Sequence, residues 1–330
     1  MRTRWLPVLC VLLLSPVCAE YLSAYDVSAS DLPTLLGGLV VLAPLYGAPA
    51  LLAREVVARR GLGWPALLLL VTALGVLQAL VIDQSVVNPE YRGFDGWSDL
   101  WQPTYVPALD LSAYAAVAFV LGHTVASFGA PLAVVGAVSR SGGRPWLGRW
   151  TALALGGLYL AAAGVVLADH LASEGWQLSA AQLAGALGLV ALLVAAALGP
   201  WPPRGGVARR VPPPWLLLLL GMVVESALGW SIVWPALVAT VVGLTFLAVA
   251  LVRWGRNRAW TDRHVVALAV GVLLSRALGG FLVEPVDGAR TTTTLLVNVC
   301  ATLLVAVLAT LTYRATRNGT RRRYGSRAAR

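Results

Sequence analysis

Residues 54–83 read REVVARRGLGWPALLLLVTALGVLQALVID and show the pattern on which the chain is built. Three arginines come first, an apolar run covers 64–82, and the stretch ends on an acid, Asp83. A helix needs about 20 residues to cross a hydrocarbon core of about 30 Å. The run has that length and carries no charge, so it predicts a membrane-spanning helix between a basic loop and an acidic one.

The loops between the apolar runs alternate in charge along nearly the whole chain. Six segments hold 22 arginines and only two acids. These basic segments are 1–4, 54–63, 139–149, 201–214, 253–263 and 314–330. Four other segments hold twelve acids and two arginines. These acidic segments are 20–31, 83–110, 169–177 and 284–292. Basic loops stay in the cytoplasm, so the alternation predicts which side of the membrane each loop faces.

The composition excludes an ordinary soluble domain. Of the 330 residues, 58% are hydrophobic and only 12% are charged, whereas charged residues make up about a quarter of soluble domains. The net charge is +10, and the positive charge is concentrated on one predicted face of a membrane. We therefore expect anionic lipid headgroups, and no nucleic acid, as partners. The three cysteines lack metal-ligand spacing, and we predict neither a metal nor a cofactor.

The fold predicted from these features is all-α: a polytopic transmembrane bundle of about ten helices with both termini cytoplasmic, in the bacterial cytoplasmic membrane. The predicted spans are 5–22, 32–53, 64–82, 111–138, 150–168, 178–200, 215–231, 235–252, 264–283 and 293–313. Residues 23–313 would form the main bundle, and the basic cytoplasmic tail 314–330 would lie against anionic lipid.

Residues 1–22 have two interpretations. They begin with arginines, continue with an apolar stretch and end on small residues before Glu20, as a signal peptide does. They also fit a first transmembrane helix, which is the interpretation that we favour. Glu20 lies outside the membrane in both cases, so the topology of the remaining chain is the same.

One short pattern occurs twice. Tyr46-Gly47-Ala48-Pro49 and Phe128-Gly129-Ala130-Pro131 each place an aromatic residue three positions before a proline within a predicted span. Proline removes a backbone hydrogen bond from a helix, so both spans are expected to bend there. The pattern indicates either an internal repeat or a coincidence in helices rich in glycine and alanine.

Polar side chains within the predicted spans are the candidates for a binding site, because ionisable groups in hydrocarbon are costly. The candidate ligand-binding residues are Glu225, Arg276, His123, Gln78 and Asn298. Glu225 and Arg276 have opposite charges at similar depths, so we predict that they pair. A functional interpretation is a polar pocket reached from outside, and a structural one is a buried salt bridge with interhelical hydrogen bonds.

The predicted outer loop 83–110 mixes acids with aromatic residues. Its candidate recognition residues are Asp83, Glu90, Asp95, Trp97 and Trp101. Long loops in compact proteins are often functional, so the loop is a candidate lid or recognition surface. The alternative is an interfacial segment whose aromatic rings lie among lipid headgroups.

Three functions remain open from the sequence. The first is a non-enzymatic transporter-like or ligand-binding protein, in which a solute or proton competes for the Glu225–Arg276 pair. The second is a membrane-embedded hydrolase or lipid-linked transferase that uses His123 with an outer acid such as Asp83, Asp110 or Glu20. The third is an assembly or scaffold protein. The chain has no P-loop, zinc-protease helix or nucleophile elbow.

Residues 32–138 carry further short motifs. They are Leu45-Tyr46-Gly47, Arg54-Glu55, the run Arg59-Arg60-Gly61-Leu62-Gly63-Trp64-Pro65, Gln84-Ser85 and Asn88-Pro89. On these motifs the chain resembles an uncharacterised family of multi-spanning membrane proteins of high-GC Gram-positive bacteria. Relatives often carry adjacent glutamates at the positions of Gln78 and Ala79, which gives the family a remote likeness to CPBP-type intramembrane proteases. This chain lacks that acid pair and keeps His123, so the resemblance implies no established activity.

Overall fold

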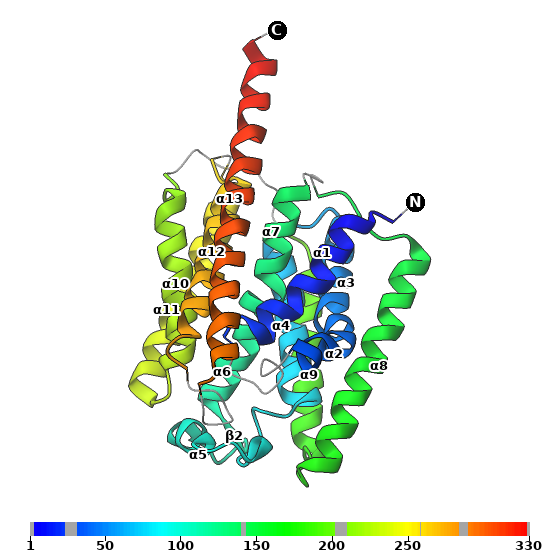
Figure 1. The fold of residues 1–330 in the computed structure, drawn as a ribbon, viewed down its shortest axis with the longest axis vertical. Helices are drawn as coiled ribbons and strands as arrows, with labels where there is room; N and C mark the ends of the chain where they lie inside the picture. The colour runs from blue at the N-terminus through cyan, green and yellow to red at the C-terminus, as the bar shows by residue number, and fades with distance from the viewer. Residues whose placement is uncertain are drawn as a thin grey trace.

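The computed structural model describes residues 3–23, 32–139, 143–201, 210–257, 259–283 and 290–328. Over these residues the chain is a bundle of helices that lie side by side, with α13 projecting beyond the others at one end (Figure 1). The all-α prediction is confirmed. The strands β1 (Tyr105–Val106) and β2 (Leu111–Ser112) form a two-stranded antiparallel ladder.

The helix bounds follow the predicted spans closely. The α-helices are α1 (Trp5–Pro16), α2 (Leu32–Leu42), α3 (Ala48–Arg59), α4 (Trp64–Val76), α5 (Trp97–Trp101), α6 (Ala113–Gly122), α7 (Ala130–Ser139), α8 (Arg149–Ser173), α9 (Ala180–Leu198), α10 (Pro214–Trp230), α11 (Trp234–Gly255), α12 (Asp262–Gly279) and α13 (Thr292–Ala328). Four wide π-helical turns continue or interrupt them: η1 (Val17–Tyr21), η3 (Ala43–Gly47), η4 (Leu77–Ile82) and η7 (His123–Gly129). Short 3-10 turns are η5 (Tyr91–Gly93) and η6 (Gln102–Thr104).

The structure supports a multi-pass membrane protein. Among the described residues, seven helical stretches are long and apolar enough to cross a bilayer. They are Pro33–Arg59, Trp64–Ile82, Ala113–Ser139, Arg149–Ser173, Ala180–Leu198, Trp234–Gly255 and Thr292–Arg317. Trp5–Tyr21 and Pro214–Trp230 are shorter apolar helices. The count of ten crossings stays a prediction.

Helix α1 packs against α7 and α3 with one face, and its other face is exposed (Figure 1). Val8 and Val11 on this helix are fully buried. Gly47 of η3 lies against the backbone of Leu12, where a Cβ atom would overlap it. The close approach of the two backbones therefore requires glycine at position 47.

A carboxylate organises the arginine-rich end of the bundle. Glu55 is buried near the end of α3 and accepts hydrogen bonds from the backbone N–H groups of Trp146 and Leu147, at 2.9 and 3.2 Å. Its other oxygen accepts from Arg59 at 2.8 Å. The guanidinium of Arg54 stacks on the Trp146 ring at 3.3 Å. These contacts attach the segment before α8 to α3, and they give Arg54-Glu55 a structural role.

Helices α10 and α12 approach each other closely through glycine. A Cβ atom on Gly221 would overlap the carbonyl oxygen of Leu268, and one on Gly271 would overlap that of Leu218. Small residues at such crossings let helix backbones come together in a membrane. This close pairing brings Glu225 of α10 next to Arg276 of α12.

We expect Gly271→Ala to destabilise the protein by about 1–3 kcal/mol, because the added methyl group forces the two helices apart. Thermal unfolding in detergent measures the change. Gly243→Ala on α11 is the matched control, since nothing lies within 4 Å of a Cβ atom there. Equal stability of the two variants would contradict the proposed close contact.

Candidate functional site

The predicted ion pair is present. The Arg276 guanidinium donates to Glu225 Oε1 at 2.8 Å, and a second guanidinium nitrogen donates to the carbonyl oxygen of Ala19 at 3.0 Å. The two side chains are only 12% (Glu225) and 22% (Arg276) exposed. Arg276 therefore joins three elements, α12, α10 and the wide turn η1, through one charged group.

The pair leaves one oxygen available. Glu225 Oε2 is buried and has no hydrogen-bond partner among the described residues. A buried acceptor without a partner costs about 1–3 kcal/mol or more when charged. The site thus keeps an acceptor that a proton or a ligand N–H group would satisfy.

A second polar contact involves Glu20, the residue of η1 that follows Ala19. Tyr46 of η3 donates its hydroxyl hydrogen to Glu20 Oε1 at 2.5 Å. The Tyr46 ring lies 5.6 Å from the His123 ring and 6.1 Å from that of Phe128. Because Ala19 and Glu20 are neighbours, the Arg276 contact and the Tyr46 contact meet on one turn. We call Glu20, Tyr46, His123, Glu225 and Arg276 the η1 cluster.

His123 lies at the edge of this cluster without a carboxylate partner. Its Nδ1 is 3.2 Å from the Ser127 hydroxyl, one turn along η7. Within the described residues no hydrogen bond or ion pair joins His123 to an acid. The hydrolase hypothesis needs a carboxylate within reach of His123 or of a shared substrate position, and no direct contact of the first kind is present.

The two aromatic-Gly-Ala-Pro motifs explain two of the wide turns. The ring of a proline clashes with the carbonyl group four residues earlier. For Pro49 that residue is Leu45 in η3, and for Pro131 it is Ser127 in η7. The helix widens before each proline, and the motif's own aromatic residues, Tyr46 and Phe128, pack together in the widened region. Wide turns of this kind are frequent at functional sites.

Gln78 belongs to a neighbouring acidic group at the end of η4. Its amide lies 3.5 Å from Asp83 Oδ2, and Asp83 Oδ1 accepts from the Ser85 backbone and hydroxyl at 3.0 and 2.7 Å. Burial raises the pKa of Asp83 to about 6, and the charge of Glu20 acts in the same direction. Hydrogen bonds from Ser85 and the charge of Arg92 lower that pKa in part.

Asn298 has a different role from the one predicted. It is buried on α13 and donates to the carbonyl oxygen of Gly280 at 2.9 Å. Gly280 in turn donates to the carbonyl oxygen of Arg276 and follows the last turn of α12. Asn298 therefore holds α13 to the end of the helix that carries Arg276.

The outer loop is a packed cap, at the end of the bundle opposite to the two termini (Figure 1). Trp97 and Trp101 are buried, and their indole N–H groups donate to the carbonyl oxygens of Asn88 and Val86, each at 3.0 Å. Glu90 and Asp95 are exposed. The tryptophans form the interior of the loop, so any recognition surface would consist of its exposed acids.

Sequence reasoning did not single out the residue that holds this loop in place. Glu174, just after α8, accepts from the Asn88 side chain at 2.9 Å and from the Arg92 backbone at 2.7 Å. Asn88 was quoted only as part of a motif. An acid far along the chain gives no local signal of such a contact.

Two cavities lie at the arginine-rich end. One of ≈ 560 Å³ borders Arg59 and Arg149, and one of ≈ 1090 Å³ borders Trp64, Trp201 and Arg256. Neither opens toward the η1 cluster. The predicted outward-facing pocket therefore stays a prediction.

We expect Glu225→Gln and Arg276→Gln each to lower stability by about 3–5 kcal/mol, because each leaves a buried charge without its partner. The double variant should recover most of the loss. Thermal unfolding of the four purified proteins measures the coupling. Singles as stable as the parent would contradict a stabilising ion pair between these two residues.

The raised pKa of Asp83 predicts a pH dependence of defined sign. The folded protein binds a proton at Asp83 more tightly than the unfolded chain, whose pKa is near 3.8. The resulting stabilisation is present below pH 3.8 and is lost as the pH rises through about 6. In stability measurements from pH 4 to pH 7, Asp83→Asn should lack this decline. Parallel curves for parent and variant would contradict the assignment.

Comparison with known proteins gives no relative from which a function could be proposed. No protein-family model, curated protein or solved structure matches the chain.

Proposed function

We propose that the chain is a transporter-like or ligand-binding protein of the bacterial cytoplasmic membrane, and that the η1 cluster is its binding site. The observation that carries this proposal is the sharing of Arg276 between Glu225 and the η1 backbone, one residue from Glu20. A purely structural pair would have its buried acceptors satisfied, whereas Glu225 Oε2 has no hydrogen-bond partner among the described residues. Ten crossings with both termini cytoplasmic complete the proposal.

The topology is supported by the arrangement of the ends. Both termini lie at one end of the bundle, and the acidic loop around α5 lies at the other (Figure 1). The arginine-rich segment before α8 is attached to α3 at the end that carries the termini. The positive-inside rule then places this end in the cytoplasm and the η1 cluster toward the outside.

The charge of the site favours a cationic ligand or a proton. Glu20, Glu225 and Asp83 contribute three carboxyl groups, whereas Arg276, and Arg92 near Asp83, contribute two positive charges in the same region. Burial of this excess of acid is costly unless protons or a cation accompany it. A small amine would satisfy Glu225 Oε2 and compensate for the charge at once.

The mechanism follows from competition at Glu225. A proton or a cation bound there weakens the attraction of Arg276, which then no longer holds η1, α10 and α12 together. A ligand that binds the released arrangement better shifts the population toward it. The wide turns η1, η3 and η7 supply the places where the helices rearrange.

One observation favours the assembly or scaffold function instead. Gly156, Gly157 and Gly164 on α8, and Gly185 and Gly188 on α9, have nothing within 4 Å of a Cβ atom. Small residues on an outer helix face allow another transmembrane helix to approach. This face is compatible with a binding site on the opposite side of the same protein.

A ligand screen tests the binding function. Purified protein in detergent is mixed with small amines, and with small carboxylic acids as the matched anions, and its melting temperature is recorded. We expect amines to stabilise the parent, by about 2.7 kcal/mol at 100 times the dissociation constant, and to have no effect on Glu225→Gln. Asp169→Asn is the control, since Asp169 is exposed on α8, outside both the η1 cluster and the outer loop.

Stabilisation by anions alone, or amine stabilisation that survives Glu225→Gln, would overturn the proposed site. A chain that responds to no solute and forms a stable oligomer through α8 and α9 would instead indicate the assembly function.

A further inference from the structure

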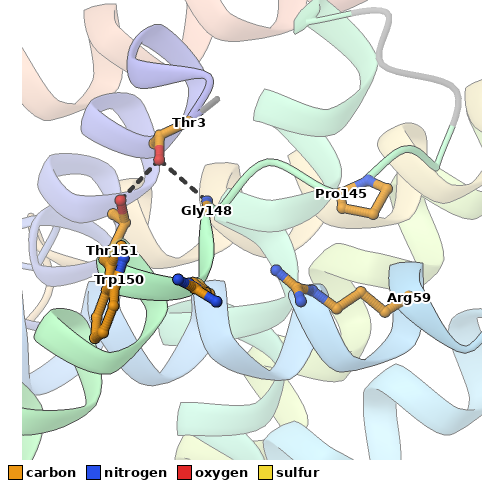
Figure 2. A pocket seen from close by; sticks show the side chains of 7 residues that line it. Thr3, Arg59, Pro145, Gly148, Trp150 and Thr151 are labelled. Carbon is orange, nitrogen blue, oxygen red and sulfur yellow. Dashed lines mark hydrogen bonds between the residues drawn. The ribbon is translucent and has the colours of Figure 1, made fainter. Parts of the chain in front are cut away.

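A basic cavity lies at the arginine-rich end, remote from the η1 cluster. It has a volume of ≈ 560 Å³ and is lined by residues that include Thr3, Arg59, Arg149, Trp150 and Thr151, with no acid among them. Figure 2 shows the Thr3 hydroxyl bonded to Thr151 and to the Gly148 backbone at the wall of this cavity. These contacts, at 2.7 and 3.1 Å, fix the start of the chain beside the first turn of α8.

One of the two guanidinium groups is held in place. Arg59 donates to Glu55 at 2.8 Å and to the carbonyl oxygen of Leu147 at 2.9 Å. Its side chain is nevertheless 47% exposed and lines the cavity. Both carboxylate oxygens of Glu55 already have partners, because the second oxygen accepts hydrogen bonds from the backbone N–H groups of Trp146 and Leu147.

The other guanidinium has no acid to neutralise it. Arg149 lies over the Trp150 ring at 4.8 Å, and among the described residues no carboxylate lies within 4 Å of it. Two like charges on one cavity repel each other, and an anion between them removes the repulsion. Guanidinium groups bind phosphate oxygens in pairs of parallel hydrogen bonds.

The surroundings of the cavity match a lipid. Trp150 is 69% exposed, a position suited to the headgroup layer, and α8 continues with Leu153 and Leu160, which are 66% and 70% exposed. The backbone N–H groups in the first turn of α8 also favour a negative charge close to them. An acyl chain could lie along these leucines while its headgroup occupies the cavity.

We infer that this cavity binds a phosphate group, carried by an anionic lipid headgroup of the cytoplasmic leaflet. The site is separate from the basic tail 314–330, for which only a diffuse attraction to anionic lipid was expected. It assigns to Arg149 the role of ligand contact and to Arg59 that of a fixed second contact.

Lipid titration tests the inference. The parent, Arg149→Gln and Arg149→Lys are titrated in a zwitterionic detergent with phosphatidylglycerol, with phosphatidylcholine and with inorganic phosphate, and the melting temperature is recorded. We expect phosphatidylglycerol to bind the parent, Arg149→Gln to weaken this binding about tenfold, and Arg149→Lys to weaken it less. Arg253→Gln is the matched control, because it removes one exposed arginine at the end of α11, outside the cavity lining.

Each outcome of the titration either supports or overturns the proposed lipid site. Phosphatidylglycerol binding that weakens in Arg149→Gln and persists in Arg253→Gln supports the lipid site. Inorganic phosphate that binds as well as phosphatidylglycerol, with the same dependence on Arg149, would overturn the lipid source and leave a site for free phosphate. Equal responses of both glutamine variants would overturn the site, and the melting temperatures without ligand show whether each variant is folded.

Discussion

The burial of the Arg276 charge is the constraint on which the arrangement of this bundle depends. A guanidinium cannot be deprotonated to escape an apolar environment, so its neighbours must supply acceptors where it lies. Glu225 supplies one and the Ala19 carbonyl another. The second acceptor is available because η1 is a wide turn, in which the backbone groups are not all in regular α-helical bonds. The charge thus selects both the close α10–α12 contact and the position of α1.

The wide turns also explain why the polar residues meet where a regular helical pattern would separate them. In a regular α-helix each residue advances by 100°, and one extra residue in a turn displaces every later side chain around the axis. The turns before Pro49 and Pro131 bring Tyr46, His123 and Phe128 into one aromatic group. Proline chemistry visible in the sequence therefore sets the geometry of the candidate site.

The parts of the structure that could be predicted are those that leave a regular pattern of residue types along the sequence. Apolar runs and the signs of the loops predicted the helical bundle, and charge with depth predicted the Glu225–Arg276 pair. The Tyr46–Glu20 contact had no such signal, because 26 residues and two wide turns separate its partners. Trp97 and Trp101 were expected at a surface, yet both are buried because their indole groups close a small core within the loop. Asn298 was assigned to the site from its depth alone, and its hydrogen bond to Gly280 at the end of α12 had no signal in the sequence.

Helix α1 is the element that contacts both chemically distinct ends of the protein. At the basic end, Thr3 just before it bonds to the first turn of α8. At the other end, η1 carries the Ala19 carbonyl and Glu20, which bind Arg276 and Tyr46. One face of α1 is buried, with Val8 and Val11 in the core, and the other is exposed at Leu6, Leu9 and Leu13. The contacts at its two ends thus attach one apolar segment to the bundle, and the geometry of both sites depends on where that segment lies.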